Sequence, residues 1–460
     1  MRIRNALKNI MCVSLASSLV CISSCSKTED EFPEMDFDET QVAESSEVQV
    51  EETELDYIEN YHEISVALPY SDETINRVAK LFYLENTSFN PRMLNGRDIS
   101  LDYLDSVDIP YIIHSVSIPN EGIGINTMAQ YRNTSTVPDI YLTYDIDSIV
   151  ESGFALPIDN YAGDIVFDNN GIYANALLQD SVDGNTYGLP LYQSVMMIYG
   201  SSQYIPSSGQ LPWRTTTSQL RNYLNNINSE FDVEELDVIP FADASQMIPY
   251  LTSAYNEDIP TPYGCLGVDN KQPLIDGVTF VSNQYRNGNS ADYNEDGSDP
   301  RVTRNVGLWM DSSADVLRWS QYYPNGLYFT SLPTASSHSN ITPYASVYSV
   351  CISNSCHDVE FAADFMTYIC LDEDAQMLLT RLEPKPGFLP VVKSSYVWDM
   401  VCGEDVFGGQ AALYKDYIGD AVYCPAPGSR VQTNVSDYCS DYINSIDTED
   451  SFDFSPEDMG

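Results

Sequence analysis

The chain has 460 residues, of which 43% are hydrophobic and 12% aromatic. A chain of this length exceeds what one small hydrophobic core supports, so we expect two lobes. Its 68 Asp and Glu against 21 Lys and Arg give a formal net charge of −47. A surface this acidic repels nucleic acid, which excludes nucleic-acid binding as the function.

The N-terminus predicts an export signal. A basic start is followed by an apolar stretch at residues 10–20, which is too short to span a bilayer as a mature helix. The stretch ends at Ser24 and Cys25. A small residue directly before a cysteine resembles the bacterial lipobox, in which the cysteine is diacylated and becomes the new N-terminus. We therefore expect a signal peptide over residues 1–24 and lipidation at Cys25; a plain signal peptide with an incidental cysteine is the alternative.

Acidic segments lie at both ends of the mature chain. Residues 25–60 begin with the lipidated cysteine and continue through acidic runs without a sustained apolar period. Such a stretch cannot bury enough surface to offset the entropy of ordering, so we expect a disordered tether. Residues 448–460 predict a second acidic segment, a frayed tail.

The body of the chain begins with alternating strands and helices. The apolar patterns predict strands at residues 64–68, 111–118 and 138–142, and helices that start near Ser71 and Gly124. Repeated strand–helix units imply a mostly parallel sheet covered on both faces. Ligands of such sheets bind beyond the carboxyl ends of the strands. Tyr144 and Asp145 fall at one such end.

The second half of the chain predicts further elements. Residues 183–190 form turns and lead into an apolar strand at residues 195–199. A helix is expected to start at residues 215–218, and a strongly amphipathic helix covers residues 359–369. Residues 282–305 predict a polar excursion between these elements.

Several segments together resemble the extracellular solute-binding proteins of ABC sugar importers, the group that includes maltose-binding protein. Residues 138–140 (PDI) and 153–161 (GFALPIDNY) resemble the family's "PD(I/V)…GxLxPLDxY" stretch, and residues 183–190 (DGNTYGLP) resemble its "DGKxYGLP". The family's ending is matched in order by residues 332–333, 347–352, 359–369 and 387–391. The polar excursion is not a shared feature, and residues after 396 match poorly.

The resemblance implies an α/β fold with two lobes, the type II periplasmic-binding-protein-like fold. Mostly parallel sheets would be flanked by helices, with the ligand cleft at the hinge. Lobe one would comprise residues 61–190 plus 334–372, and lobe two residues 191–333 plus 373–447. The implied protein is a monomer, anchored by lipid on the extracytoplasmic face of the cell membrane. It would capture a mono- or oligosaccharide and deliver it to an ABC transporter permease.

A site for a sugar needs carboxylates and amides for the hydroxyl edges and aromatic rings for the C–H faces. Matching to the family gives the ligand-binding candidates Tyr144, Asp145, Tyr192, Gln193, Trp309, Asp311 and Ser312. Structural roles stay open for several of them: core packing for Trp309, loop capping for Tyr144 and Asp145, and hinge packing for Tyr192. If they bind sugar, Asp145→Ala and Trp309→Ala should weaken binding at least tenfold with little change in folding.

One segment suggests a metal site. Asp292, Asn294 and Asp296 precede Gly297 with the spacing of the first half of an EF-hand loop. The twelfth position is Thr303 rather than a bidentate Glu. Calcium binding and a simple polar loop both stay open, and we expect no other cofactor.

Cysteine pairing cannot be deduced from the sequence. An odd number of cysteines follows Cys25, none in CxxC spacing, and the chain has four His, so no zinc cluster is expected. These cysteines are Cys265, Cys351, Cys356, Cys370, Cys402, Cys424 and Cys439.

No sequence motif of a hydrolase is evident. The chain has no HExxH, no GxSxG and no Cys–His nucleophile context, so we expect no enzymatic activity. With 68 carboxylates, a glycosidase pair is not excluded by residue type. The alternatives are therefore an exported lipoprotein enzyme acting on glycans, or a solute-binding protein for peptides or polyamines.

Overall fold

The computed structural model describes part of the chain. The described residues are 62–87, 95–161, 171–231, 238–255, 272–294, 296–324, 326–334, 343–403 and 410–430. The predicted signal peptide, Cys25, tether and acidic tail lie outside them, as do Cys265 and Cys439. Within them, no helix combines the length and apolar character that crossing a membrane requires.

The chain first builds a group of parallel strands. Strand β1 (His62–Leu68) pairs in parallel with β2 (Tyr111–Ser117) and β3 (Ile140–Thr143), which confirms the three predicted strands. Helix α2 (Asp72–Asn86) starts where predicted, because the Ser71 side chain accepts a hydrogen bond from the backbone N–H of Thr74. The helices on this group are α3 (Leu101–Asp105), α4 (Ile125–Asn133) and α5 (Ile146–Glu151).

Strand β6 (Gly188–Ser201) forms the centre of the sheet, and all of its residues are buried. Its first part pairs antiparallel with β11 (Tyr344–Ile352) and β12 (Leu389–Pro390). Its last part pairs antiparallel with β9 (Val306–Ser312) and β10 (Leu327–Thr330). Strand β6 therefore connects β11 and β12, which pair with its first part, to β9 and β10, which pair with its last part.

A second parallel group lies beyond β9. Strand β7 (Ile239–Ala242) pairs in parallel with β9 and with β8 (Ser290–Ala291). Helix α8 (Thr217–Glu230) starts where the sequence predicts, and a capping box between Thr216 and Gln219 closes this start. The predicted parallel pairing therefore holds at both ends of the sheet, while β6 and β11 make its centre antiparallel.

Further helices and several short strands complete the fold. They are α7 (Ala174–Leu177), β4 (Ser181–Val182), β5 (Asn185–Thr186), α10 (Ile248–Tyr255), α11 (Gln272–Arg286), α12 (Pro300–Thr303), α13 (Val316–Tyr322), α14 (Val359–Leu371), α15 (Glu373–Leu382), α16 (Ser395–Gly403), α17 (Gln410–Lys415) and β13 (Val422–Tyr423), with 3-10 turns between several of them. The predicted polar excursion thus contains β8 and α12.

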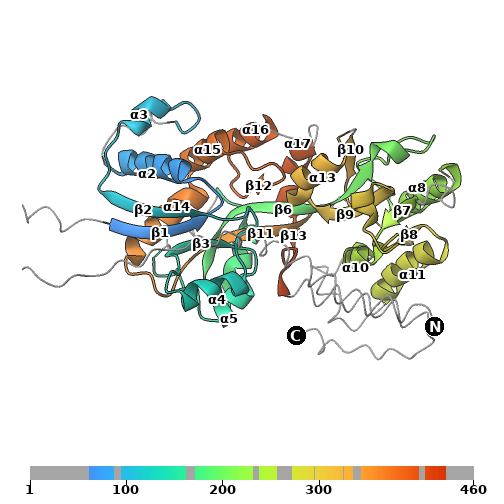
Figure 1. Ribbon diagram of the computed structural model, residues 1–460, viewed down its shortest axis with the longest axis horizontal. Coiled ribbons are helices and arrows are strands. Elements are labelled where there is room, and N and C mark those ends of the chain that lie inside the picture. Colours follow the sequence, from blue (N-terminus) through green and yellow to red (C-terminus); the bar gives the residue numbers. More distant parts are fainter. Residues whose placement is uncertain are drawn as a thin grey trace, which may run out of the picture. The chain divides into compact units, whose positions relative to one another are not determined.

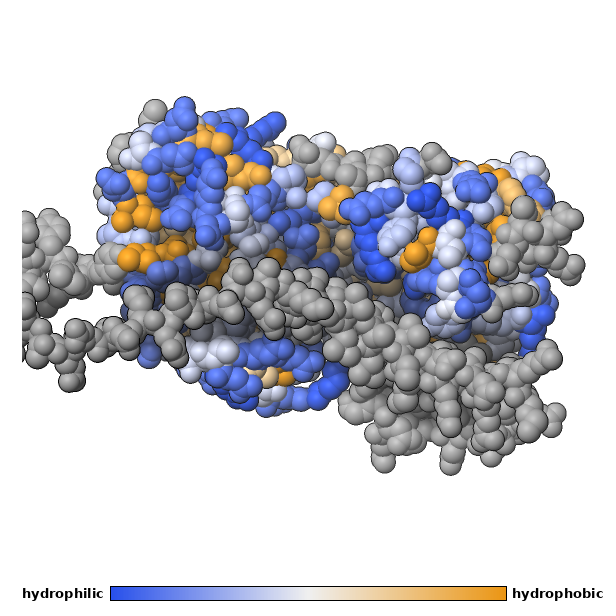
Figure 2. Space-filling model, in the orientation of Figure 1, coloured by the Kyte–Doolittle hydropathy of each residue, from blue (hydrophilic) through white to orange (hydrophobic). Residues whose placement is uncertain are grey.

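Helices cover both faces of the first parallel group (Figure 1). On one face, Val66 and Leu142 pack with α2, α14 and α15, and on the other, Tyr141 packs with Met128 of α4 and Ile149 of α5. The visible surface of the described residues is largely hydrophilic (Figure 2), in keeping with the acidic composition.

The bounds of the two expected lobes stay a prediction, and the hydrophobic cores contain segments from both of them. We call the hydrophobic cluster that contains Val66 and Leu142 the first core. Along β6, buried residues up to Tyr192 belong to the first core, and those from Val195 onward belong to two other hydrophobic clusters. Helix α15 lies in the expected lobe two; its Leu378 packs in the first core with α2, and its Met377 packs in another core. Asp372 caps the start of α15 directly after α14 ends, and α15 then packs against the first core.

Candidate functional site

A pocket lies at the carboxyl end of β3, where the strand–helix pattern predicts a ligand. We call it the β3-end pocket. Its walls enclose about 500 Å³ of empty space, open solvent included. It is lined by Thr143, Tyr144, Asp145, Ile146, Asp147, Gln179, Val347, Ser349, Cys424, Pro425, Ala426 and Ser429.

Tyr144 presents an aromatic ring to this pocket. The side chain is half-buried, and its phenol oxygen passes close over the backbone of Gly124. A Cβ at Gly124 would stand 2.4 Å from that oxygen, so only glycine permits this position of the ring. Gly124 thus leaves room for the Tyr144 ring at the strand end.

Two carboxyl groups face the same pocket from the start of α5. Asp145 caps the helix: its carboxylate accepts hydrogen bonds from Ser148 N (3.3 Å) and Oγ (2.9 Å), and from Arg430 N (3.2 Å). Asp147 is exposed, and partial desolvation followed by the charges of Asp145 and Glu151 raises the pKa of its carboxyl. Asp147 is therefore the more available of the two for a ligand hydroxyl.

Four of the predicted candidates fall into two places: Tyr144 and Asp145 line the β3-end pocket, and Asp311 and Ser312 belong to a second group near Ser194. Val347 and Ser349 line the β3-end pocket, whereas Tyr348 between them points to the other face, as strand alternation requires. There the Tyr348 hydroxyl lies 3.2 Å from Ser194 Oγ, which accepts a 2.9 Å hydrogen bond from Ser312 Oγ. We call this second group, with Asp311 and Asp315, the central polar cluster.

The carboxyl groups of the central polar cluster are largely committed to protein partners. Asp311 accepts hydrogen bonds from Trp319 Nε1 and from the backbone N–H of Ser312, both at 2.8 Å. Burial raises its pKa. Burial and the charge of Asp311 raise the pKa of Asp315 to about 7, with a smaller contribution from Glu121. The cluster ties β6, β9 and β11 together.

Tyr192 and Gln193 lie on opposite faces of β6. Tyr192 is buried, packs 4.5 Å from the ring of Phe388, and donates its hydroxyl to the carbonyl of Asn120. Gln193 is fully buried, donating to Pro390 O (2.7 Å) and accepting from the Tyr423 hydroxyl (2.6 Å). Its amide has both ends paired and holds β12 and the β13 segment to β6.

Trp309 corrects an expectation. Its ring is 0% exposed and lies between Tyr199 (5.6 Å between centroids) and Tyr323 (4.9 Å), both stacked, with Trp319 at its edge. A sugar needs an exposed ring face, and none is left here. The apolar strand β9 carries this side chain into the core, so Trp309 packs there rather than beside a ligand.

The sequence analysis missed several residues of these two sites, among them Asp315 of the central polar cluster. Asp147 and Gln179 line the β3-end pocket, and Ser194 and Tyr348 belong to the central polar cluster. The period of two along a strand carried the needed signal, because Ser194 shares the face of Tyr192 while Gln193 does not. Gln179 had no local signal, since it reaches the pocket through tertiary packing.

The polar side chains of the EF-hand-like loop form hydrogen bonds with nearby groups of the protein. The Asn294 amide donates to Ser298 Oγ and Thr303 Oγ1, both at 2.8 Å, and the Asp296 carboxylate accepts from Ser298 N and Oγ. Asp292 accepts a hydrogen bond from the Tyr285 hydroxyl. Calcium binding by this loop stays a prediction.

Cys351, Cys356, Cys370 and Cys424 form no disulfide in the described part of the chain.

Comparisons with known sequences give no relatives. No protein-family model matches the chain, and no curated protein matches it.

Solved structures do resemble the chain along most of its length. A cyclic alpha-maltosyl-1,6-maltose binding protein from Arthrobacter globiformis is 13% identical with a TM-score of 0.60, covering 87% of this chain and 97% of its own. The sugar-binding protein MalE from Xanthomonas citri is 12% identical with a TM-score of 0.58, covering 86% and 95%. An ABC substrate-binding protein from Listeria monocytogenes, solved with cycloalternan, is 13% identical with a TM-score of 0.57, covering 87% and 96%.

At such low identity, these likenesses establish the fold. The chain has the type II solute-binding fold that the sequence predicts, with helix-flanked parallel strand groups joined through β6.

Proposed function

We propose that the protein is an extracytoplasmic solute-binding lipoprotein that captures a mono- or oligosaccharide and delivers it to an ABC transporter permease. The observation that carries the proposal is the agreement of fold over 86–87% of the chain with proteins that bind sugars. The neighbours are binding proteins, so the proposal is binding without turnover. The exported protein would act as a monomer.

The chemistry of the β3-end pocket supports a neutral, hydroxyl-rich ligand. Asp147 and the amide of Gln179 offer hydrogen-bonding groups for sugar hydroxyls, and Tyr144 offers a ring for a sugar face. The described lining contains no Lys or Arg, which disfavours phosphate and sulfate. We include Asp145 in the site as the group that caps α5 and holds Asp147 at the pocket.

The lipid anchor is proposed from the sequence alone. Cys25 follows Ser24 at the end of the export signal, and its acylation would hold the binding body at the outer face of the membrane. Metabolic labelling with a fatty acid tests this: the wild-type chain should be labelled and Cys25→Ser should not. Equal labelling of both chains would contradict the anchor.

A thermal-shift screen of the purified chain tests the ligand class. Neutral oligosaccharides should raise the melting temperature, because a ligand at 100 times its Kd adds about 2.7 kcal/mol to the stability of the folded state. Peptides and polyamines belong in the screen, since two carboxyl groups in a pocket also suit an amine. A shift with these and none with any sugar would overturn the carbohydrate assignment.

A glycan turnover assay tests the binding role itself. The purified chain should bind glycans without releasing products, and sustained product release would show an exported enzyme instead.

A further inference from the structure

A buried carboxyl group contacts the wall of the β3-end pocket from the protein interior. Asp180 ends the short 3-10 turn Leu178–Asp180 and is 0% exposed, whereas Leu178 and Gln179 of the same turn are exposed. Gln179 lines the pocket, and Asp180 is not part of its lining. The turn therefore places one side chain at the pocket and the next one inside the protein.

The Asp180 carboxyl connects two parts of that wall. It accepts a hydrogen bond from the hydroxyl of Ser349, which lines the pocket from β11. Because this hydroxyl gives its hydrogen to Asp180, its oxygen is left to accept a hydrogen bond from a ligand hydroxyl. The Gln179 amide donates to the carbonyl of Asn175 (3.3 Å), so Gln179 is held by the same segment of the chain that Asp180 joins to β11.

The surroundings of Asp180 favour its uncharged form. Its second oxygen, Oδ2, is buried without a hydrogen-bond partner, so a carboxylate here would have one donor for two oxygens. The titratable groups that face it from other elements are the thiols of Cys351 on β11 and Cys370 on α14, and burial keeps both uncharged by raising their pKa. Among the described residues no positive charge offsets burial, which raises the pKa of Asp180 to about 7.

We propose that Asp180 is a positioning residue of the β3-end pocket: its buried, uncharged carboxyl holds Ser349 and Gln179 where they contact the ligand, and loss of its proton releases them. The inference rests on the proposed function, because that function assigns the ligand to this pocket. A buried carboxylate with one donor is costly, and its hydration requires the turn to move away from β11. Opening such a turn costs little free energy, since two of its three residues are already exposed.

This coupling sets the direction of a pH dependence. Binding needs the turn in its buried position, and that position favours the protonated carboxyl. Ligand affinity is therefore highest well below pH 7 and falls as the pH rises through 7. An asparagine at position 180 cannot titrate, has the same shape and still accepts a hydrogen bond from Ser349, so it removes the pH dependence.

Calorimetric titration at pH 5 and pH 8, with a sugar found in the thermal-shift screen, tests the proposal. Wild type should bind at least about threefold more weakly at pH 8 than at pH 5. Asp180→Asn should bind equally at the two pH values, within about twofold of wild type at pH 5. Asp180→Ala removes the acceptor of the Ser349 hydroxyl and should bind more weakly than Asp180→Asn at both.

Hydrogen exchange of the ligand-free chain separates this inference from the proposed function. In wild type, the amides of residues 178–187 should exchange faster at pH 8 than at pH 5 after correction for the intrinsic effect of pH, because the turn opens when Asp180 ionises. In Asp180→Asn the corrected rates should be equal. If no sugar binds at either pH, the proposed function fails, and exchange alone decides whether Asp180 holds the turn.

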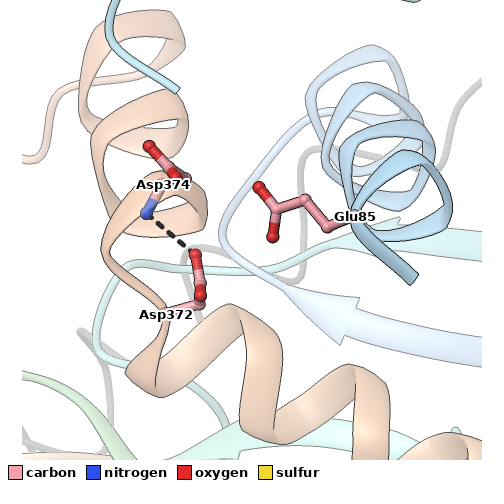
Figure 3. A group of neighbouring side chains, drawn as sticks. All are labelled: Glu85, Asp372 and Asp374. Atoms are coloured by element: carbon pink, nitrogen blue, oxygen red, sulfur yellow. Dashed lines mark hydrogen bonds between the residues drawn. The ribbon is translucent and has the colours of Figure 1, made fainter. Parts of the chain in front are cut away.

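Glu85 supplies the matched control. Its carboxyl lies near those of Asp372 and Asp374 at the junction of α14 and α15 (Figure 3), where one oxygen of each lies within 4.8 Å of the others. Burial and then the charges of the two aspartates raise the pKa of Glu85 to about 8, so it titrates in the same range, and it does not line the β3-end pocket.

Glu85→Gln should therefore keep the pH dependence of wild type in both measurements. The positioning role is overturned if wild type shows no pH dependence, if Asp180→Asn shows the same pH dependence as wild type, or if Glu85→Gln abolishes it.

Discussion

The β3-end pocket and the central polar cluster contain the same kinds of side chain and yet differ in what those side chains contact. In the pocket, Asp147 is exposed and Tyr144 keeps part of its ring open. In the cluster, Ser312 and Asp311 are paired with groups on the protein itself. The difference teaches that residue type alone does not define a binding site. A polar side chain can contact a ligand only where groups on neighbouring strands do not already form hydrogen bonds with it.

The largest expected effect concerns the aromatic core beside the cluster. Trp309→Ala should lower the free energy of unfolding by about 3–5 kcal/mol, because it removes a fully buried ring that stacks on Tyr199 and Tyr323. Urea unfolding measures the loss. This replaces the expectation from the sequence that the variant would affect sugar binding alone, and an unchanged unfolding midpoint would contradict the core assignment.

A buried acid beneath the pocket wall should make stability depend on pH. Asp180 is fully buried, accepts a hydrogen bond from Ser349, and leaves Oδ2 without a partner. Burial raises its pKa to about 7, so the folded state holds the proton more tightly than the unfolded state. The stabilisation is complete below about pH 4 and is lost as the pH rises through 7.

Asp180→Asn cannot titrate and should therefore remove this loss. Relative to wild type, the variant should gain about 3 kcal/mol of stability between pH 5 and pH 8, from roughly two pKa units between pH 5 and the folded-state pKa at about 1.4 kcal/mol per unit. Urea unfolding at the two pH values checks it. Parallel pH profiles for the two chains would show that Asp180 does not resist ionisation in the folded state.

A smaller loss is expected within the central polar cluster. Asp311→Ala removes the acceptor of Trp319 Nε1 and leaves that buried N–H without its partner, which should cost about 2 kcal/mol of stability. Unfolding by urea measures this cost, with Asp147→Ala as the exposed control, for which we expect a change below about 0.5 kcal/mol. Equal losses in the two variants would remove the distinction between cluster and pocket.

Local patterns predicted most of the fold. Strands β1, β2 and β3 and the capped starts of α2 and α8 lie where apolar period and capping residues place them, because these signals depend on neighbours in sequence. The antiparallel centre was not predicted, because pairing between β6 and β11 depends on residues more than a hundred positions apart. The apolar period of a strand does not indicate which distant strand it pairs with.

The site was predicted only in part, for the same physical reason. Tyr144 and Asp145 line a pocket because a strand end is a local feature. Trp309 and Gln193 were grouped with them by the family resemblance, whereas burial by distant segments places both in the interior. The cluster of Glu85 with Asp372 and Asp374 joins residues almost 300 positions apart, which no spacing in the sequence indicates.

Calorimetric titration with a sugar found in the screen tests the central claim most directly, through two matched variants. Asp147→Asn in the β3-end pocket should bind at least tenfold more weakly than wild type, about 1.4 kcal/mol, with unchanged unfolding. Ser312→Ala in the central polar cluster should keep its affinity within about twofold, 0.4 kcal/mol by the same relation. Wild-type affinity in Asp147→Asn together with lost affinity in Ser312→Ala would contradict the claim and place the ligand on the other face of β11.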